Sequence, residues 1–183
     1  MRTKYYIALL FTVIAAASCQ HSKVEQQASS LDSIQAQTKV SNGVIHIPGI
    51  TRTDTIKVGN RTYQYTFHRE AQDSLGIVED DMGTRYADNF YQLTILRDGG
   101  NFFKRRFTKA DFRSLLGADF RQNGIFDGFR YSHSDDGKLF FSACISYPES
   151  DMSAPFFVVI GPDGSYTVQQ DNTSDMPDEI DGV

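Results

Sequence analysis

Residues 91–107 read YQLTILRDGGNFFKRRF, and this stretch shows the strand–turn–strand pattern that recurs along much of the chain. Two runs with aromatic and β-branched side chains, 91–97 and 101–107, lie on either side of Asp98-Gly99-Gly100. Such side chains favour extended backbone, and Asp-Gly is a preferred sequence for the tight turn of a β-hairpin. The stretch therefore predicts two antiparallel strands joined by a short turn.

Three further turns repeat this arrangement, at Gly59-Asn60, Asp136-Gly137 and Pro162-Asp163-Gly164. Four hairpins in one chain predict an antiparallel all-β domain. We expect a β-sandwich, and a small open β-barrel is the alternative that the same turns allow. Leu139–Ile145 and Phe156–Ile160 are apolar on both faces, which predicts a central place in a sheet.

One short helix is predicted among the strands, over residues 109–116. Thr108 is a good N-cap, and Asp111 completes a weaker form of the capping box. Gly117 is typical of a helix end. The apolar face of this helix, which we expect to cover part of the sheet, would consist of Phe112, Leu115 and Leu116.

The N-terminus has the order of a secretory signal: positive, then apolar, then small side chains. Its uncharged run, 5–17, is shorter than the roughly 20 residues that a membrane-spanning helix needs. Ala16-Ala17-Ser18-Cys19 resembles the lipobox at which signal peptidase II cuts before a lipid-modified cysteine, with Ala16 in place of the usual Leu. We therefore predict a signal peptide over 1–18 and lipid attachment at Cys19.

Three segments are predicted beyond the signal. Residues 19–42 contain the lipidated cysteine and a Gln- and Ser-rich stretch that is typical of a flexible tether. Residues 43–170 contain all four hairpins and are long enough for one domain with its own core. Residues 171–183 form an acidic tail with little to bury, which we expect to fray.

The net charge argues against nucleic-acid binding, and the cysteine content argues against a disulfide bond. The net charge of the 183-residue chain is -5, which argues against nucleic acid as a partner because phosphate backbones require a basic surface. Only two cysteines are present, so a lipid on Cys19 leaves Cys144 without a disulfide partner. The apolar run around Cys144 predicts a buried thiol that acts as a small hydrophobic side chain.

The sequence contains no histidine, cysteine or glycine spacing of a known catalytic, metal or cofactor motif. Carboxylates are the remaining candidates: Asp80 and Asp81 are adjacent, and Asp88 follows shortly after. Two acids about 5–10 Å apart would suit glycoside hydrolysis, and oxygen-rich loops can hold calcium. Because Asp is also a standard turn residue, we favour a structural use and predict no catalytic residue, metal or cofactor.

A basic strip, Lys104, Arg105 and Arg106, lies among aromatic residues such as Phe103 and Phe107. Such a strip could bind a glycan or an anionic lipid head group. Charged side chains also keep an exposed edge strand from pairing with other chains, and we favour this second interpretation. The strip and the three aspartates remain weak candidates for binding.

Several short sequence motifs between about Arg61 and Asp171 indicate a resemblance to a protein family. They are Tyr86-Ala87-Asp88-Asn89, Leu93-Thr94-Ile95, Arg97-Asp98-Gly99, Phe107–Phe112, Asp127-Gly128 and the loop Pro148–Pro155. With the signal, they resemble an uncharacterised lipoprotein family of Bacteroides-type Gram-negative anaerobes, catalogued as a domain of unknown function. The resemblance implies a cell-envelope location and a compact domain, and it carries over no catalytic residue. Surface lipoproteins of such bacteria often have acidic residues after the cysteine; Gln20–Lys23 are not acidic, which implies the periplasmic side.

These observations lead to one expected function and two rivals. We expect an exported, membrane-anchored lipoprotein whose non-catalytic β domain binds a protein or a glycan of the cell envelope. The first rival is a carboxylate-dependent hydrolase acting on envelope or dietary glycans, which requires two acids facing each other in a concave pocket. The second rival is a purely structural or assembly role.

Overall fold

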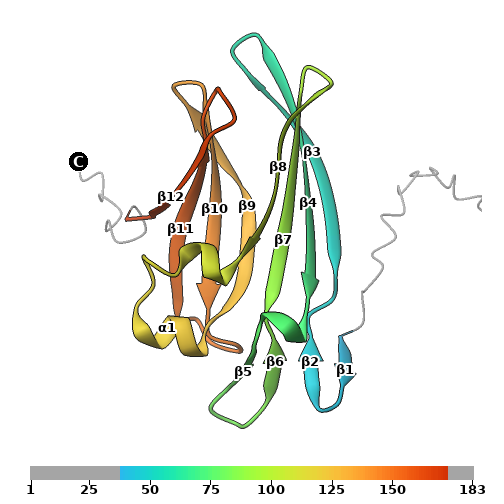
Figure 1. Ribbon diagram of the computed structural model, residues 1–183, viewed down its shortest axis with the longest axis vertical. Helices are drawn as coiled ribbons and strands as arrows, with labels where there is room; N and C mark the ends of the chain where they lie inside the picture. Colours follow the sequence, from blue (N-terminus) through green and yellow to red (C-terminus); the bar gives the residue numbers. More distant parts are fainter. Residues whose placement is uncertain (1–37, 173–183) are drawn as a thin grey trace, which may run out of the picture. The chain divides into compact units, whose positions relative to one another are not determined.

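The computed structural model describes residues 38–172. Within this range, two four-stranded antiparallel sheets face each other, and a smaller four-stranded sheet continues from the first one (Figure 1). None of the three sheets closes into a barrel. The predicted all-β sandwich with one short α-helix is therefore confirmed, and the barrel alternative is excluded.

Consecutive hairpins build both large sheets. The first has the order β3-β4-β7-β8, with β3 (Ile50–Val58), β4 (Arg61–Ala71), β7 (Asn89–Arg97) and β8 (Gly100–Thr108). The second has the order β12-β11-β10-β9, with β9 (Ile125–Asp135), β10 (Lys138–Ser146), β11 (Ser153–Ile160) and β12 (Tyr166–Gln170). All four predicted hairpins are present, and the two apolar runs form the inner strands β10 and β11, as expected.

The third sheet was not predicted. It has the order β1-β2-β6-β5, with β1 (Lys39–Ser41), β2 (Val44–His46), β5 (Ile77–Glu79) and β6 (Arg85–Ala87). Strands β2 and β6 pair in parallel, unlike the pairs of the large sheets. Strand β1 and its turn lie inside the segment predicted as a flexible tether, so that prediction is wrong for residues 39–42. Asn42 and Gly43 both have positive φ, as the turns of two-residue hairpins require.

The predicted helix over 109–116 is wrong in its position. The structure has a 3-10 turn, η2 (Lys109–Phe112), and then a separate α-helix, α1 (Ala118–Asn123). The capping box does form, because the Asp111 carboxylate accepts the Thr108 backbone N–H at 2.8 Å. The helical segment ends after one short 3-10 piece, a length typical of that helix type, and Leu115 of the predicted apolar face is 39% exposed while Phe112 and Leu116 are buried. Gly117, expected to end the helix, is instead the N-cap of α1.

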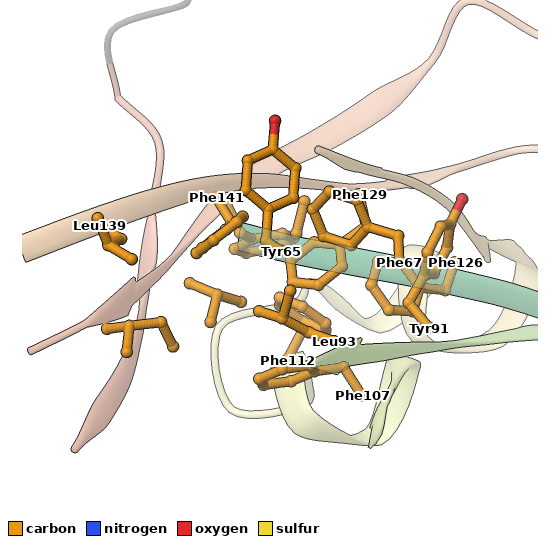
Figure 2. Packing of buried hydrophobic residues seen from close by; sticks show 14 of the residues in the cluster. Tyr65, Phe67, Tyr91, Leu93, Phe107, Phe112, Phe126, Phe129, Leu139 and Phe141 are labelled. Atoms are coloured by element: carbon orange, nitrogen blue, oxygen red, sulfur yellow. The ribbon is translucent and has the colours of Figure 1, made fainter. Parts of the chain in front are cut away.

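Aromatic rings fill the space between the two large sheets (Figure 2). Phe129 contacts Phe67 from the first sheet, with ring centroids 5.1 Å apart, and Phe141 from its own sheet at 6.0 Å. Burial of one such side chain contributes roughly 1.5–3 kcal/mol. Alternate residues of each strand supply this core, which fixes the faces of both sheets.

Strand alternation also corrects the prediction for the cysteine. Cys144 is half-buried rather than buried, because its neighbours Ala143 and Ile145 point into the core and it points to the outer face. The predicted signal peptide, Cys19 and most of the tether lie outside the described residues, as does the tail beyond Asn172. From residue 38 to 172, the structure contains no helix long and apolar enough to span a membrane.

Candidate functional site

Two adjoining surface hollows lie beside the small third sheet and form what we call the acidic groove. Their volumes are about 600 and 450 Å³, and they share Tyr147, Pro148, Glu149 and Ser150 from the loop between β10 and β11. The acidic residues that line them are Glu79, Asp80, Asp81, Asp127, Glu149 and Asp151. Carboxylates from three separate segments of the chain therefore converge on one surface.

Asp80 holds the turn between β5 and β6. Its Oδ1 atom accepts the backbone N–H groups of Thr84 at 2.8 Å and Met82 at 2.9 Å. These bonds, with that of Thr84 the largest cause, hold the pKa of Asp80 below its usual value. The Asp80 carboxylate is thus ionised at neutral pH and stabilises the turn through these hydrogen bonds. Asp81 is exposed beside it.

Tyr86 forms part of the same surface from strand β6. Its ring is only 6% exposed, and its hydroxyl donates toward the Oδ2 atom of Asp80 at 3.5 Å. Burial raises the pKa of the Tyr86 phenol, and the nearby carboxylates of Glu149 and Asp80 raise it further. The phenol therefore stays protonated beside two negative charges, as a donor rather than an acid or base at neutral pH.

Glu149 has an unusual backbone conformation for its residue type. Its φ is 53°, in the left-handed region. Within the described residues, the other non-glycine positions with positive φ are Asn42, Asp98 and Asp136, each followed by glycine in a hairpin turn. Asn and Asp tolerate this region because their short side chains bond locally, whereas Glu gains no such compensation. The groove therefore keeps a carboxylate at a position where another residue would be less strained.

Asp88 does not line the acidic groove. It lies between β6 and β7, is 1% exposed, and lines a different pocket. Its Oδ1 atom accepts the backbone N–H groups of Phe126 at 2.7 Å and Asn89 at 2.8 Å, while its Oδ2 atom lies 3.5 Å from the Lys109 ammonium. Burial raises the pKa of Asp88, although the amides and Lys109 oppose this shift. Because Phe126 belongs to β9, Asp88 links the two large sheets.

Neighbouring side chains strengthen this link. The Asn89 Nδ2 atom donates to the Phe126 carbonyl at 3.0 Å, and the Tyr91 hydroxyl donates to the Asp127 carbonyl at 2.5 Å. Sequence reasoning singled out Asp88 as a possible acid and missed Asn89 and Tyr91. The three side chains together satisfy the first backbone groups of β9, which is a structural use.

The carboxylates considered for hydrolysis are thus divided between two sites. Asp80 and Asp81 belong to the acidic groove, whereas Asp88 lines a pocket that contains neither of them. In the part of the chain that the structure describes, no group of three or more His, Cys, Asp or Glu side chains is arranged to hold a metal ion.

The basic strip lies on β8, which is an edge strand of the first sheet. Arg105 pairs with Asp111 at 2.7 Å, and its guanidinium lies over the Tyr166 ring. Arg106 lies over the Phe90 ring, 3.7 Å from its centroid, and donates to Gln72. Lys104 is exposed. Both arginines are therefore used within the fold, which leaves little of the strip free for a ligand.

These features define a small all-β sandwich domain with an acidic surface groove. A comparison with protein families gives a match to Domain of unknown function (DUF4738) over residues 30–168. The chain therefore belongs to this family. None of the curated proteins compared with the chain matches it.

Proposed function

We propose that the protein is an exported, lipid-anchored lipoprotein whose β domain binds a cationic polypeptide in the acidic groove without catalysing a reaction. The observation that carries the binding part is the convergence of carboxylates from residues 79–81, 127 and 149–151 on one surface. The anchor rests on the signal-like N-terminus and on Cys19. A periplasmic address and a Bacteroides-type source rest on resemblance.

The charges of the groove are not balanced from within. Asp81, Glu149 and Asp151 form no ion pair with other residues between 38 and 172. Like charges held together raise the free energy of the unbound domain, and a partner that supplies Lys or Arg side chains relieves this repulsion. The hydroxyl of Tyr86 and the ring of Tyr147 add polar and apolar contact area beside the charges.

The binding part is tested with a lysine-rich decapeptide and fluorescence anisotropy. Removing two exposed charges with Asp81→Asn and Glu149→Gln should weaken binding by about three- to tenfold, since exposed pairs contribute up to about 1 kcal/mol each. The matched control is Asp135→Asn with Asp136→Asn, which removes two acids at the distant β9–β10 turn. Equal affinity of the two double variants would overturn the proposal.

The same variants separate the rivals. If neutral glycans bind and the peptide does not, the partner is a glycan. If capture of an envelope partner is unchanged by the groove substitutions, a structural or assembly role fits better. The placing of Asp80 and Asp88 in different hollows argues against the paired-carboxylate hydrolase, and turnover of a glycan panel by the purified protein would revive it.

The anchor has its own test. Cells that express the full chain or its Cys19→Ala variant are grown with a clickable palmitate analogue. Label on the natural chain and none on the variant is the expected result. An unlabelled natural chain would exclude lipid attachment and leave the binding proposal unaffected.

A further inference from the structure

The pocket that contains Asp88 has a charge opposite to that of the whole chain. We call it the basic pocket; its volume is about 420 Å³, and the residues that matter here are Ser74, Thr108, Lys109, Arg113, Leu116 and Arg121. Three of these six carry a positive charge, in a chain whose net charge is -5. They come from η2, the segment that follows it, and α1, and Ser74 comes from the 3-10 turn η1 (Asp73–Leu75).

The single acid in this pocket is already satisfied. Asp88 uses one oxygen for two backbone N–H groups and faces Lys109 with the other. Lys109 is held as well, because its ammonium donates to the Gly124 carbonyl at 2.5 Å and its side chain is only 16% exposed. The charges of Asp88 and Lys109 therefore offset each other at the base of the pocket.

The side chains of Arg113 and Arg121 differ from Lys109 in having no partner among residues 38–172. Neither guanidinium forms a hydrogen bond, ion pair or ring contact with any other residue that the structure describes. By contrast, Arg105 and Arg106 on β8 are both engaged by a side chain and a ring. The pocket thus has two unpaired planar cations at its rim, suited to bidentate contact with a carboxylate or phosphate group.

The backbone at the end of α1, three residues beyond Arg121, is closely packed. Gly124, which follows the helix, is buried so tightly that an added Cβ would lie 2.7 Å from Ile145 of β10 and 2.7 Å from the Phe120 carbonyl. Only glycine fits there. The helix is therefore pressed against the second sheet, and Arg121 faces a pocket whose other wall comes from the first half of the chain.

We propose that the basic pocket binds a small molecule carrying an oxyanion, either a carboxylate or a phosphate, between Arg113 and Arg121. The hydroxyls of Ser74 and Thr108 line the same space and provide neutral hydrogen-bonding groups. Leu75 and Leu116 form an apolar wall for the uncharged part of the ligand. This site is independent of the acidic groove, with which it shares no lining residue.

The test is isothermal titration calorimetry on the full chain in detergent at constant ionic strength, with inorganic phosphate, glucose 6-phosphate, glucuronate and uncharged glucose. Arg113→Gln with Arg121→Gln should weaken oxyanion binding at least tenfold, which corresponds to about 1.4 kcal/mol. The matched control, Arg52→Gln with Lys57→Gln, removes two exposed cations from β3 and should bind as the natural chain does. Thermal unfolding of both variants shows that the fold is kept.

The choice of probes decides the source of the oxyanion. Binding of the two phosphates alone assigns a phosphate, and binding of glucuronate alone assigns a carboxylate. Three results overturn the proposal: no probe binds, glucose binds as tightly as the anions, or the Arg113/Arg121 variant binds as tightly as the control. If the lysine-rich decapeptide fails to bind the acidic groove, the proposal for the basic pocket is unaffected, because the two surfaces share no lining residue.

Discussion

The basic pocket and the acidic groove lie on different sides of α1, and they also differ in how they are built. Arg121 lines the pocket and Asn123 lines the groove, and residues two positions apart on an α-helix point in nearly opposite directions. The pocket has a buried base, in which Asp88 and Lys109 also join the two large sheets. The groove has exposed acids on turns. We therefore expect substitutions at the base of the pocket to change stability and substitutions in the groove to change binding.

The largest effect is expected for Asp88→Ala. This change leaves the buried N–H of Phe126 without an acceptor and removes the partner of Lys109, at a cost of about 3 kcal/mol. Asp88→Asn should cost less, because both amides bond to a single oxygen that Asn can replace. Urea denaturation measures both values. Equal losses for Ala and Asn would show that charge, rather than hydrogen bonding, is the contribution of Asp88.

The next effect is expected for Lys109→Met, which keeps the length of the side chain and removes its charge. The Gly124 carbonyl and Asp88 each lose a partner, and we expect a loss of about 2 kcal/mol. Combined with Asp88→Asn, the loss should be less than the sum, because the two residues contact each other. Additive losses in chemical denaturation would mean that the pair is not coupled.

A third prediction concerns pH, because Asp88 and Asp80 should respond to it in opposite directions. The raised pKa of Asp88 gives stability that is fully present below the unfolded value of about 3.9 and is lost as pH rises through the folded pKa. The lowered pKa of Asp80 gives stability that is present above about 3.9 and is lost as pH falls through the folded pKa.

Urea denaturation between about pH 3 and 7 checks this prediction, with pKa values of about 3.9 for unfolded Asp as the reference. The destabilisation caused by Asp88→Asn should shrink as pH rises, and that caused by Asp80→Asn should grow. Slopes of the same sign for the two variants would contradict the opposite environments of these carboxylates.

The smallest effect is expected for Glu149→Asn in the groove. Asn adopts positive φ more readily than Glu, so the fold should gain up to about 1 kcal/mol. The same change removes a charge and should weaken binding of the lysine-rich peptide. Thermal unfolding and anisotropy on one sample measure both. A variant that is less stable would show that Glu149 contributes more to the fold than its backbone conformation costs.

The elements that were predicted correctly depend on local signals. The four hairpins were found because their Asp-Gly, Gly-Asn and Pro-Asp-Gly turns lie between runs that favour strands. The β1–β2 hairpin has an equally clear Asn42-Gly43 turn, but its strands are only three residues long and the Gln- and Ser-rich segment before it obscured them. The misplaced helix shows the opposite case, because its capping box forms at Thr108 but the helical segment ends at Phe112.

The candidate sites were harder to predict because their parts are far apart in the chain. Asp80 and Asp81 are adjacent in the sequence, but nothing in the sequence places Glu149 beside Tyr86. The basic strip on β8 was more visible than Arg113 and Arg121, although both of its arginines are occupied within the fold. Whether a charged side chain is already paired depends on its neighbours in space.

The sequence by itself determined the strand-turn pattern and the apolar character of β10 and β11, because turn conformation and alternation act over a few residues. Only the tertiary structure decided the use of Asp88, which bonds to an amide 38 residues away in the other sheet. It also decided that Cys144 faces outward, and that acids and cations gather on different sides of α1. Such contacts depend on how the two sheets stack, and the free energy of that stacking comes from the aromatic core as a whole.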